Sequence, residues 1–285
     1  MSGEKCICKM NSVLLGQENQ TPLNRMGLGA RGLNGNQLKL IAVISMLIDH
    51  TAFLLLGYGL LPAISADAFR YHIWSLIYYG MRCIGRLAFP IYAFLLVEGF
   101  LHTRDWRKYA LRLGIFAAIS EIPFDLMVFP RRFVSLCDWK FLWEMQNVFF
   151  TLLIGLLTIK SLDLVNRKTN RNQSLTFFLC LGILGAGSFL AWMLKADYDL
   201  VGVVLIALFY QFRQDRVKQC IMGFIWFFST LGSGRYFLGM AAAFLLIFCY
   251  NGKQGENRGK YRYYLFYPAH MLLLYGIFRI IFLAF

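Results

Sequence analysis

The chain has 285 residues, of which 58% are hydrophobic and only 15% are charged. Because a soluble domain carries about 25% charged residues, this composition excludes an ordinary soluble globular protein and indicates an integral membrane protein. The formal net charge of +14 does not indicate a nucleic-acid partner, since the lysines and arginines gather in alternate loops rather than on one stripe. The cysteines are scattered without metal-ligand spacing, so we expect free thiols and no metal site.

Apolar segments follow a polar N-terminal tail, 1–36, and fill a single transmembrane domain, 37–285. A helix needs about 20 mostly apolar residues to cross a bilayer. The expected fold class is therefore all-α and polytopic, with about nine transmembrane helices, the sixth to eighth being short. The predicted segments are Leu38–Leu60, Met81–Leu101, Tyr109–Phe129, Asn147–Leu164, Leu175–Leu194, Leu200–Phe212, Val217–Leu231, Tyr236–Tyr250 and Tyr263–Phe285.

The basic residues predict how these segments are oriented in the membrane. Lysine and arginine are dense in the N-terminal tail and after every second segment, at 104–112, 160–171, 213–218 and 253–262. The loops between these positions carry fewer basic residues. Because cytoplasmic loops are enriched in lysine and arginine, we expect the N-terminus in the cytoplasm and the C-terminus outside.

The first segment contains an acid and a histidine, Asp49 and His50, deep in otherwise apolar sequence. With a rise of about 1.5 Å per residue, His50 lies about 18 Å from the cytoplasmic end of this helix. An ionisable group at that depth costs roughly 2.5 to 3.5 kcal/mol on insertion scales, so such residues are functional candidates by default. Neighbouring residues of a helix point about 100° apart, so we expect Asp49 to pair elsewhere rather than to orient the His50 ring.

Other polar residues are expected at a similar depth and form an outer layer. Two arginines lie one turn apart in the second segment, and two carboxylates lie one turn apart in the third. A compensated ion-pair network that only holds the bundle together is the alternative to a functional layer. The candidate catalytic residues are His50, Glu121 and Asp49, and the candidate substrate ligands are Arg82, Arg86, Asp125, Asn147 and Asp197.

A second group of polar residues is expected nearer the cytoplasm. Lys39 precedes His50 by about three turns on nearly the same helix face. An inner layer is expected to contain Glu98, His102, Tyr267 and His270. The candidate ligands for the phosphates of a cytoplasmic cofactor are Lys39, Arg104, Arg107 and His270, although the arginines also fit ordinary positive-inside residues.

Blocks of this sequence resemble the TraX family of bacterial membrane proteins. They occur in order and cover nearly everything after the tail: Leu38–His50 (LKLIAVISMLIDH), Gly85–Arg104 (GRLAFPIYAFLLVEGFLHTR), Arg112–Leu126 (RLGIFAAISEIPFDL), Asn147–Ile159 (NVFFTLLIGLLTI), Ala196–Tyr210 (ADYDLVGVVLIALFY) and Phe266–His270 (FYPAH). The family's conjugative-plasmid member is associated with N-terminal acetylation of pilin. The resemblance therefore implies a multi-pass acetyltransferase of the bacterial inner membrane.

The first segment is also similar to that of other transmembrane acyltransferases, including heparan-alpha-glucosaminide N-acetyltransferase and bacterial sugar O-acyltransferases. Those proteins place a basic residue and a histidine on the first conserved span, and the corresponding positions here are Lys39 and His50. A lysine thus stands where the sugar enzymes usually have arginine.

The leading hypothesis is transfer of an acetyl group from acetyl-CoA to an amine or hydroxyl of a pilin-like protein or an envelope glycan. Histidine titrates near pH ~6.5 when unperturbed, so His50 is the expected base, oriented by Glu121 or Asp125. One alternative is a proton-coupled secondary transporter that uses Asp49, His50 and Glu121. Another is a non-enzymatic assembly factor in the lipid bilayer.

Overall fold

The computed structural model describes residues 32–131, 144–168, 173–232, 234–255 and 261–283, and within these ranges the chain forms helices and no strand. The predicted all-α fold class is therefore confirmed. The elements are α3 (Gly35–Thr51), η1 (Ala52–Leu60), α4 (Leu61–Ala63), α5 (Ala68–Gly85), α6 (Ala88–His102), α7 (Trp106–Val128), α8 (Val148–Lys168), α9 (Gln173–Met193), α10 (Asp199–Gln211), α11 (Arg216–Leu231), η3 (Gly234–Tyr236), α12 (Phe237–Phe248), α13 (Arg262–Phe278) and η4 (Arg279–Leu283).

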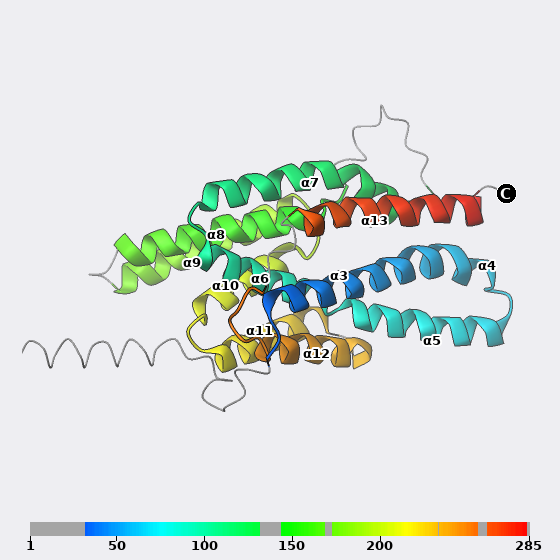
Figure 1. The fold of residues 1–285 in the computed structure, drawn as a ribbon, viewed down its shortest axis with the longest axis horizontal. Coiled ribbons are helices and arrows are strands. Elements are labelled where there is room, and N and C mark those ends of the chain that lie inside the picture. Colours follow the sequence, from blue (N-terminus) through cyan, green and yellow to red (C-terminus); the bar gives the residue numbers. More distant parts are fainter. Residues whose placement is uncertain (1–31, 132–143, 169–172, 233, 256–260, 284–285) are drawn as a thin grey trace, which may run out of the picture.

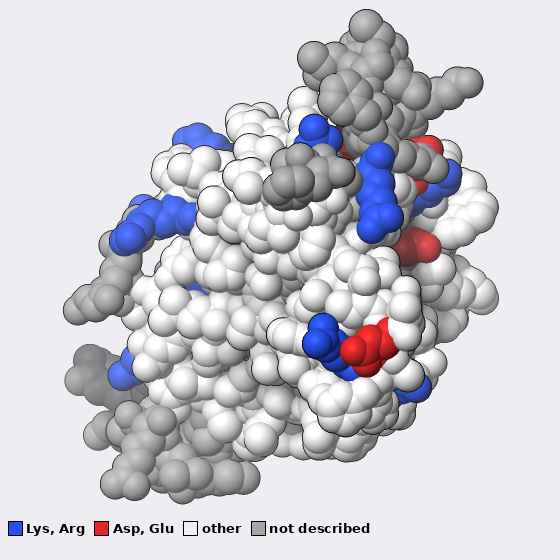
Figure 2. All heavy atoms as spheres, turned by 90° about the vertical axis from the view of Figure 1, so that its right-hand side faces the viewer, with Lys and Arg blue, Asp and Glu red and all other residues white. Residues whose placement is uncertain are grey.

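The helices have the length and surface of a membrane protein. Within the described ranges, five stretches are long and apolar enough to cross a bilayer: Gly35–Ala63, Ala68–His102, Val148–Arg167, Gln173–Met193 and Arg262–Phe282. The outer faces of α5 and α9 expose large apolar side chains such as Phe69 and Phe178. Figure 2 shows that the face seen from one end of the molecule carries only scattered charged side chains. The chain is thus a membrane protein with several apolar helices, and the count of nine spans stays a prediction.

The second predicted segment, Met81–Leu101, is wrong in its bounds. The structure has two helices here, because α5 ends at Gly85 and α6 begins at Ala88. The first half of α5 was not predicted, since Arg70, Tyr71 and His72 interrupt its apolar sequence. One consequence concerns the two arginines: Arg82 lies in the last turn of α5, and Arg86 is its C-cap.

The helices surround a central α6, which contacts α3, α8, α10 and α12. In Figure 1, α7 and α13 run side by side along one side of the molecule, and α11 and α12 lie on the opposite side. The α8–α9 hairpin extends toward one end, and the hairpin of α3, η1, α4 and α5 extends toward the other. The helix of the first segment changes to π-helical geometry at Ala52, directly after the turn that contains His50.

Local sequence explains where several helices begin. Asn34 and Gln37 form a capping box at the start of α3. The carboxylate of Asp105 accepts hydrogen bonds from the backbone N–H groups of Arg107 and Lys108 at the start of α7. Asp215 caps α11 in the same way. The backbone N–H of Lys108 lowers the pKa of Asp105, because a hydrogen bond donated to the carboxylate favours its charged form.

Two non-helical segments meet in the interior of the bundle. Residues 144–147 precede α8 and residues 194–198 precede α10, and they are joined by hydrogen bonds from Gln146 N to Lys195 O (3.1 Å) and from Asp197 N to Gln146 O (2.8 Å). The side-chain amide of Asn147 reaches the carbonyl of Ala117, near the middle of α7. Helix α8 therefore begins beside the middle of α7 and not at its ends, and α10 begins beside the start of α8. Non-helical backbone at such a depth is tolerated where protein covers it or where it lines a cavity.

We predict that Gly239→Ala destabilises the packing of α12 against α5. A Cβ at this position would lie 1.9 Å from the backbone carbonyl oxygen of Cys83, which cannot rotate away. Forced overpacking of this kind costs about 1–3 kcal/mol, so the melting temperature of the purified protein should fall. The matched control is Gly80→Ala in α5, where an added Cβ meets nothing within 4 Å. Equal melting temperatures for the two variants would contradict the close contact.

Candidate functional site

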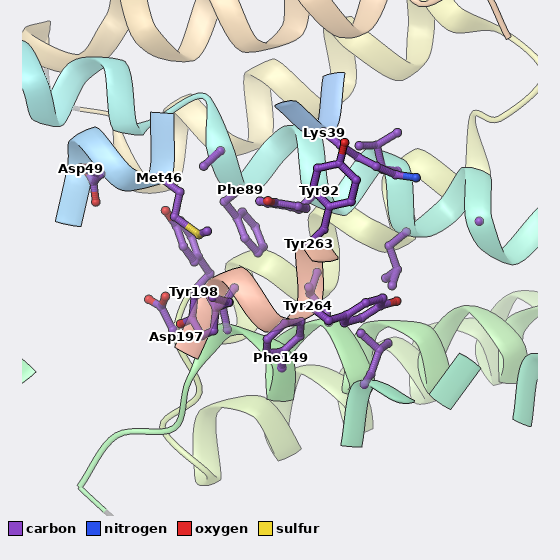
Figure 3. A pocket seen from close by; sticks show the side chains of 18 of the residues that line it. Lys39, Met46, Asp49, Phe89, Tyr92, Phe149, Asp197, Tyr198, Tyr263 and Tyr264 are labelled. Atoms are coloured by element: carbon purple, nitrogen blue, oxygen red, sulfur yellow. The ribbon is translucent and has the colours of Figure 1, made fainter. Parts of the chain in front are cut away.

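A cavity of about 780 Å³ lies between α3, α6, α7, α8 and α13. Its wall at one end includes Asn36, Lys39, Arg112 and Gln254, and its wall at the other end includes Asp49, His50, Arg82, Arg86 and Asp197. The space therefore extends along α3 from Lys39 to His50. Figure 3 shows the aromatic side chains between these ends, among them Phe89, Tyr92 and Phe149. A mostly apolar cavity with a few convergent polar groups is typical of a ligand site.

His50 is held by a second histidine on the last helix. Its Nδ1 lies 2.7 Å from Nε2 of His270, and Nδ1 of His270 lies 2.8 Å from the carbonyl oxygen of Phe266. The two imidazole rings are nearly parallel, with an angle of 5° between their planes. His270 is buried and does not line the cavity, whereas His50 does.

The hydrogen bonds fix the tautomers of the neutral pair. A carbonyl oxygen only accepts, so Nδ1 of His270 carries the proton and its Nε2 is the acceptor. Nδ1 of His50 must then donate to His270, which leaves the Nε2 lone pair of His50 without a proton. His50, a residue of the cavity wall, thus has an unprotonated nitrogen that can act as a base. The expected orienting partners, Glu121 and Asp125, are wrong: His270 occupies that position.

Asp49 pairs with Arg82 of α5, as expected for a residue on a different face from His50. The Arg82 guanidinium donates to Oδ2 of Asp49 at 2.5 Å, and it also lies over the ring of Phe53. Glycine at position 85 leaves the room that the Asp49 side chain occupies beside α5, because a Cβ there would clash with the Asp49 carboxylate. The carboxylate of Asp49 is therefore already engaged by Arg82, which argues against its predicted catalytic role.

Arg86 and Asp197 lie at the same end of the cavity. The guanidinium of Arg86 lies 5.2 Å from the ring centroid of Tyr236 and within electrostatic range of Asp49 and Asp197. Asp197 sits in a turn where Lys195, Tyr198 and Asp199 all have positive φ angles, of 51°, 64° and 44°. Left-handed backbone in residues other than glycine costs energy and is concentrated at functional sites. The Tyr198 ring holds the turn by stacking on Phe89, with 3.8 Å between centroids.

The two carboxylates of α7 form a separate cluster outside the cavity wall. Oε2 of Glu121 accepts from the side-chain amide of Asn147 at 2.5 Å. Asp125, one turn later, is fully buried, and within the described ranges neither of its oxygens has a hydrogen-bond partner. Glu121 and Asp125 were expected in one layer with His50, and Asn147 near the outer end of its span, but none of the three lines the cavity. Asn147 is fully buried against Glu121 and Ala117 of α7, so it lies in the bundle interior and not at the outer end of a span.

The Lys39 end of the cavity differs from the predicted cofactor site. Lys39 lines the wall, with its Nζ 5.9 Å from the ring centroid of Tyr263. Arg104 and Arg107 are exposed and do not line it, and His270 lies at the opposite end. Arg112, which sequence reasoning assigned only to the basic loops, lies on the wall and hydrogen-bonds to Tyr264. Among the described residues, Lys39 and Arg112 are thus the cations that line this end of the space.

Glu98 also lies on the wall and forms an ion pair with buried Arg216 (3.5 Å). Arg216 was predicted only as a loop residue, because it lies in the basic segment 213–218, and its burial comes from packing that the sequence pattern does not show. Within the described ranges no cluster of histidine, cysteine or carboxylate side chains is arranged to hold a metal ion.

Comparison with known proteins gives a consistent match. A family model described as TraX protein matches residues 34–278. The chain is 31% identical over 257 residues to a protein named "Probable fimbrial assembly protein FimC, serogroup H1" from Dichelobacter nodosus, a match that covers 84% of this chain and 93% of that protein. No solved structure matches the chain.

We predict that Arg82→Met destabilises the protein, because it leaves the Asp49 carboxylate without its cation. Removing one partner of a buried ion pair costs about 3–5 kcal/mol, whereas replacing both partners is often close to neutral. The double variant Asp49→Asn, Arg82→Met should therefore regain most of the melting temperature lost by the single variant. If the double variant melts as low as Arg82→Met, the ion pair is not the cause.

Proposed function

The chain belongs to the TraX family, and we propose that it is a membrane-embedded acetyltransferase that moves an acetyl group from acetyl-CoA to an amine or hydroxyl. The observation that carries this proposal is that His50 lines the cavity while its Nδ1 contacts Nε2 of His270, whose own Nδ1 contacts the Phe266 carbonyl; in the neutral pair this leaves Nε2 of His50 without a proton. A base at this position meets the need of acyl transfer, in which the attacking group loses a proton.

The hydrogen-bond chain suits His50 to this role. When Nε2 takes a proton from the attacking group, the imidazolium keeps its Nδ1–H bond to His270, so the ring does not turn. No side chain needs to move, because both bonds are already made before the reaction. Direct transfer to the acceptor follows from this arrangement more simply than an acyl-enzyme, since among the described residues no serine or cysteine lines the cavity.

The Lys39 end of the cavity fits the acetyl donor. Acetyl-CoA carries phosphates at one end and a thioester at the other, joined by a narrow chain. Lys39 and Arg112 would bind the phosphates, and the aromatic wall with Tyr92, Tyr263 and Tyr264 would contact the chain. The volume of about 780 Å³ lies within the roughly 300–1,000 Å³ typical of ligand pockets. In the predicted orientation, with the N-terminus inside, this end faces the cytoplasm of a bacterial inner-membrane protein.

The acceptor would enter at the end that contains Arg86 and Asp197. The similarity to a protein named for fimbrial assembly supports a pilin-like protein as the acceptor, and an envelope glycan is the other candidate. Mass spectrometry of envelope proteins and glycans, with and without this chain, would identify the acceptor by the loss of one acetyl group.

A proton-coupled secondary transporter is the second candidate function. Its support is the pair Glu121 and Asp125, which lies in the bundle without an ion pair to any described cation. Such carboxyls need a proton or another cation to offset the cost of burial. Substrate flux into proteoliposomes in the absence of acetyl-CoA would favour the transporter. Activity that requires acetyl-CoA would favour the acetyltransferase.

We predict that His50→Ala lowers acetyl transfer from labelled acetyl-CoA by about 10²- to 10⁴-fold, because a general base contributes that range. His270→Ala should also lower the rate, since it releases the Nδ1 proton of His50 from its acceptor. His72→Ala is the matched control, because His72 is exposed on α5 and lies outside the cavity. Undiminished transfer by His50→Ala would exclude His50 from the mechanism.

We predict that Arg112→Gln raises the KM for acetyl-CoA by about 10- to 100-fold and changes kcat little. Hydrogen bonds to charged groups contribute roughly 1.5–3 kcal/mol, and ~1.4 kcal/mol corresponds to a factor of ten. Arg107→Gln is the control, because this arginine is exposed and does not line the cavity. Equal KM values for the two variants would place the phosphates elsewhere.

A further inference from the structure

Tyr267 lies beside the two histidines, on the same helix as His270. Its side chain is only 4% exposed and lines the cavity. The ring centroid lies 6.3 Å from that of His50 and 5.0 Å from that of Phe149. Tyr267 and His50 thus reach the same end of the cavity from α13 and α3.

The hydroxyl oxygen of Tyr267 meets the beginning of α8. The backbone N–H of Val148, the first residue of that helix, lies next to this oxygen and interacts favourably with it. The first N–H groups of a helix have no partner within the helix and carry its partial positive charge. An N–H at this place faces a lone pair of the hydroxyl oxygen, so the hydroxyl proton is left for another acceptor. A hydroxyl oxygen that interacts with a helix N–H group makes its own O–H a stronger hydrogen-bond donor, because hydrogen bonds in a chain polarise one another.

We propose that Tyr267 is a catalytic residue that donates a hydrogen bond to the carbonyl oxygen of the acetyl thioester as that oxygen becomes negative. This inference rests on the proposed acetyl transfer. The acceptor's nitrogen or oxygen forms a bond to the carbonyl carbon and loses its proton to Nε2 of His50, while the carbonyl π electrons move to oxygen. The C=O bond then re-forms, the carbon–sulfur bond breaks, and the leaving sulfur takes the proton from His50.

Other polar groups at this end of the cavity are less suited to the oxyanion. The guanidinium of Arg82 is already paired with Asp49, and Tyr198 stacks on Phe89 within the strained turn. Tyr264 is hydrogen-bonded to Arg112, at the end assigned to the phosphates. Tyr267 combines contact with His50, a place on the wall and a hydroxyl whose oxygen is already fixed by α8. Preorganised donors of this kind are the usual means of stabilising a developing oxyanion.

A purely structural role is the competing explanation, because the same contact joins α13 to α8. The two roles differ in kinetics. A lost structural bond lowers the amount of folded protein, whereas a lost oxyanion donor lowers the rate of each folded molecule. The matched control is Tyr275→Phe, two turns later on α13 and away from the cavity wall.

The test compares full-length wild type, Tyr267→Phe and Tyr275→Phe in membranes supplied with labelled acetyl-CoA. Rates are divided by the amount of protein that binds labelled CoA, so that misfolded protein does not count. We expect Tyr267→Phe to lower kcat by about 10²- to 10³-fold, as loss of one oxyanion donor does, with the KM for acetyl-CoA little changed. Tyr275→Phe should keep the wild-type kcat.

The outcomes separate this inference from the proposed function. Transfer by wild type with an equal normalised kcat for Tyr267→Phe would overturn the role of Tyr267 and leave the acetyltransferase intact. A rise in KM with unchanged kcat would also overturn it. Tyr267 would then bind the substrate and the transition state equally, and would not stabilise the transition state in particular. Absence of transfer by wild type would overturn both.

Discussion

The contact between His50 and His270 is the interaction on which the rest of the site depends. In a bilayer the polar groups of a protein must find their partners inside the protein, because no water is available to replace them. Here one backbone carbonyl, at Phe266, is the end point of a chain of two imidazoles. The same chain joins α3 to α13 and sets which nitrogen of His50 is free. The same two hydrogen bonds therefore determine both the packing of α3 against α13 and the nitrogen of His50 that can accept a proton.

The second constraint is the depth at which α8 and α10 begin. Their preceding segments pair with each other and with α7, so the N-terminal end of α8 points at the middle of the bundle. A helix start at a membrane surface would expose its free N–H groups to water or headgroups. A start in the interior offers them to side chains, as Asn147, Glu121 and Tyr267 show. The cavity thus receives polar groups from helix ends as well as from ionisable side chains.

The sequence was sufficient for the all-α class, for the presence of apolar helices and for the candidates in the first segment. Asp49 and His50 are conspicuous because ionisable residues rarely occur in such sequence, and the angle between adjacent residues was enough to separate their roles. The partner of His50 was not predictable from depth, because counting residues from a membrane surface assumes that each helix starts there. That assumption placed His270 and Tyr267 in an inner layer and Asn147 at an outer surface. The break at Arg86–Leu87 was also hidden, since both flanking stretches are similarly apolar.

The histidine pair joins positions that are 220 residues apart, with one partner in the first helix described and the other in α13, near the end of the chain. During synthesis, α3 enters the membrane long before α13 exists. A ribosome-bound chain that has inserted every earlier helix still has His50 without its acceptor, and α8 without the tyrosine that meets its first N–H. The base and its hydrogen-bond acceptor therefore come together only when α13 packs against α3.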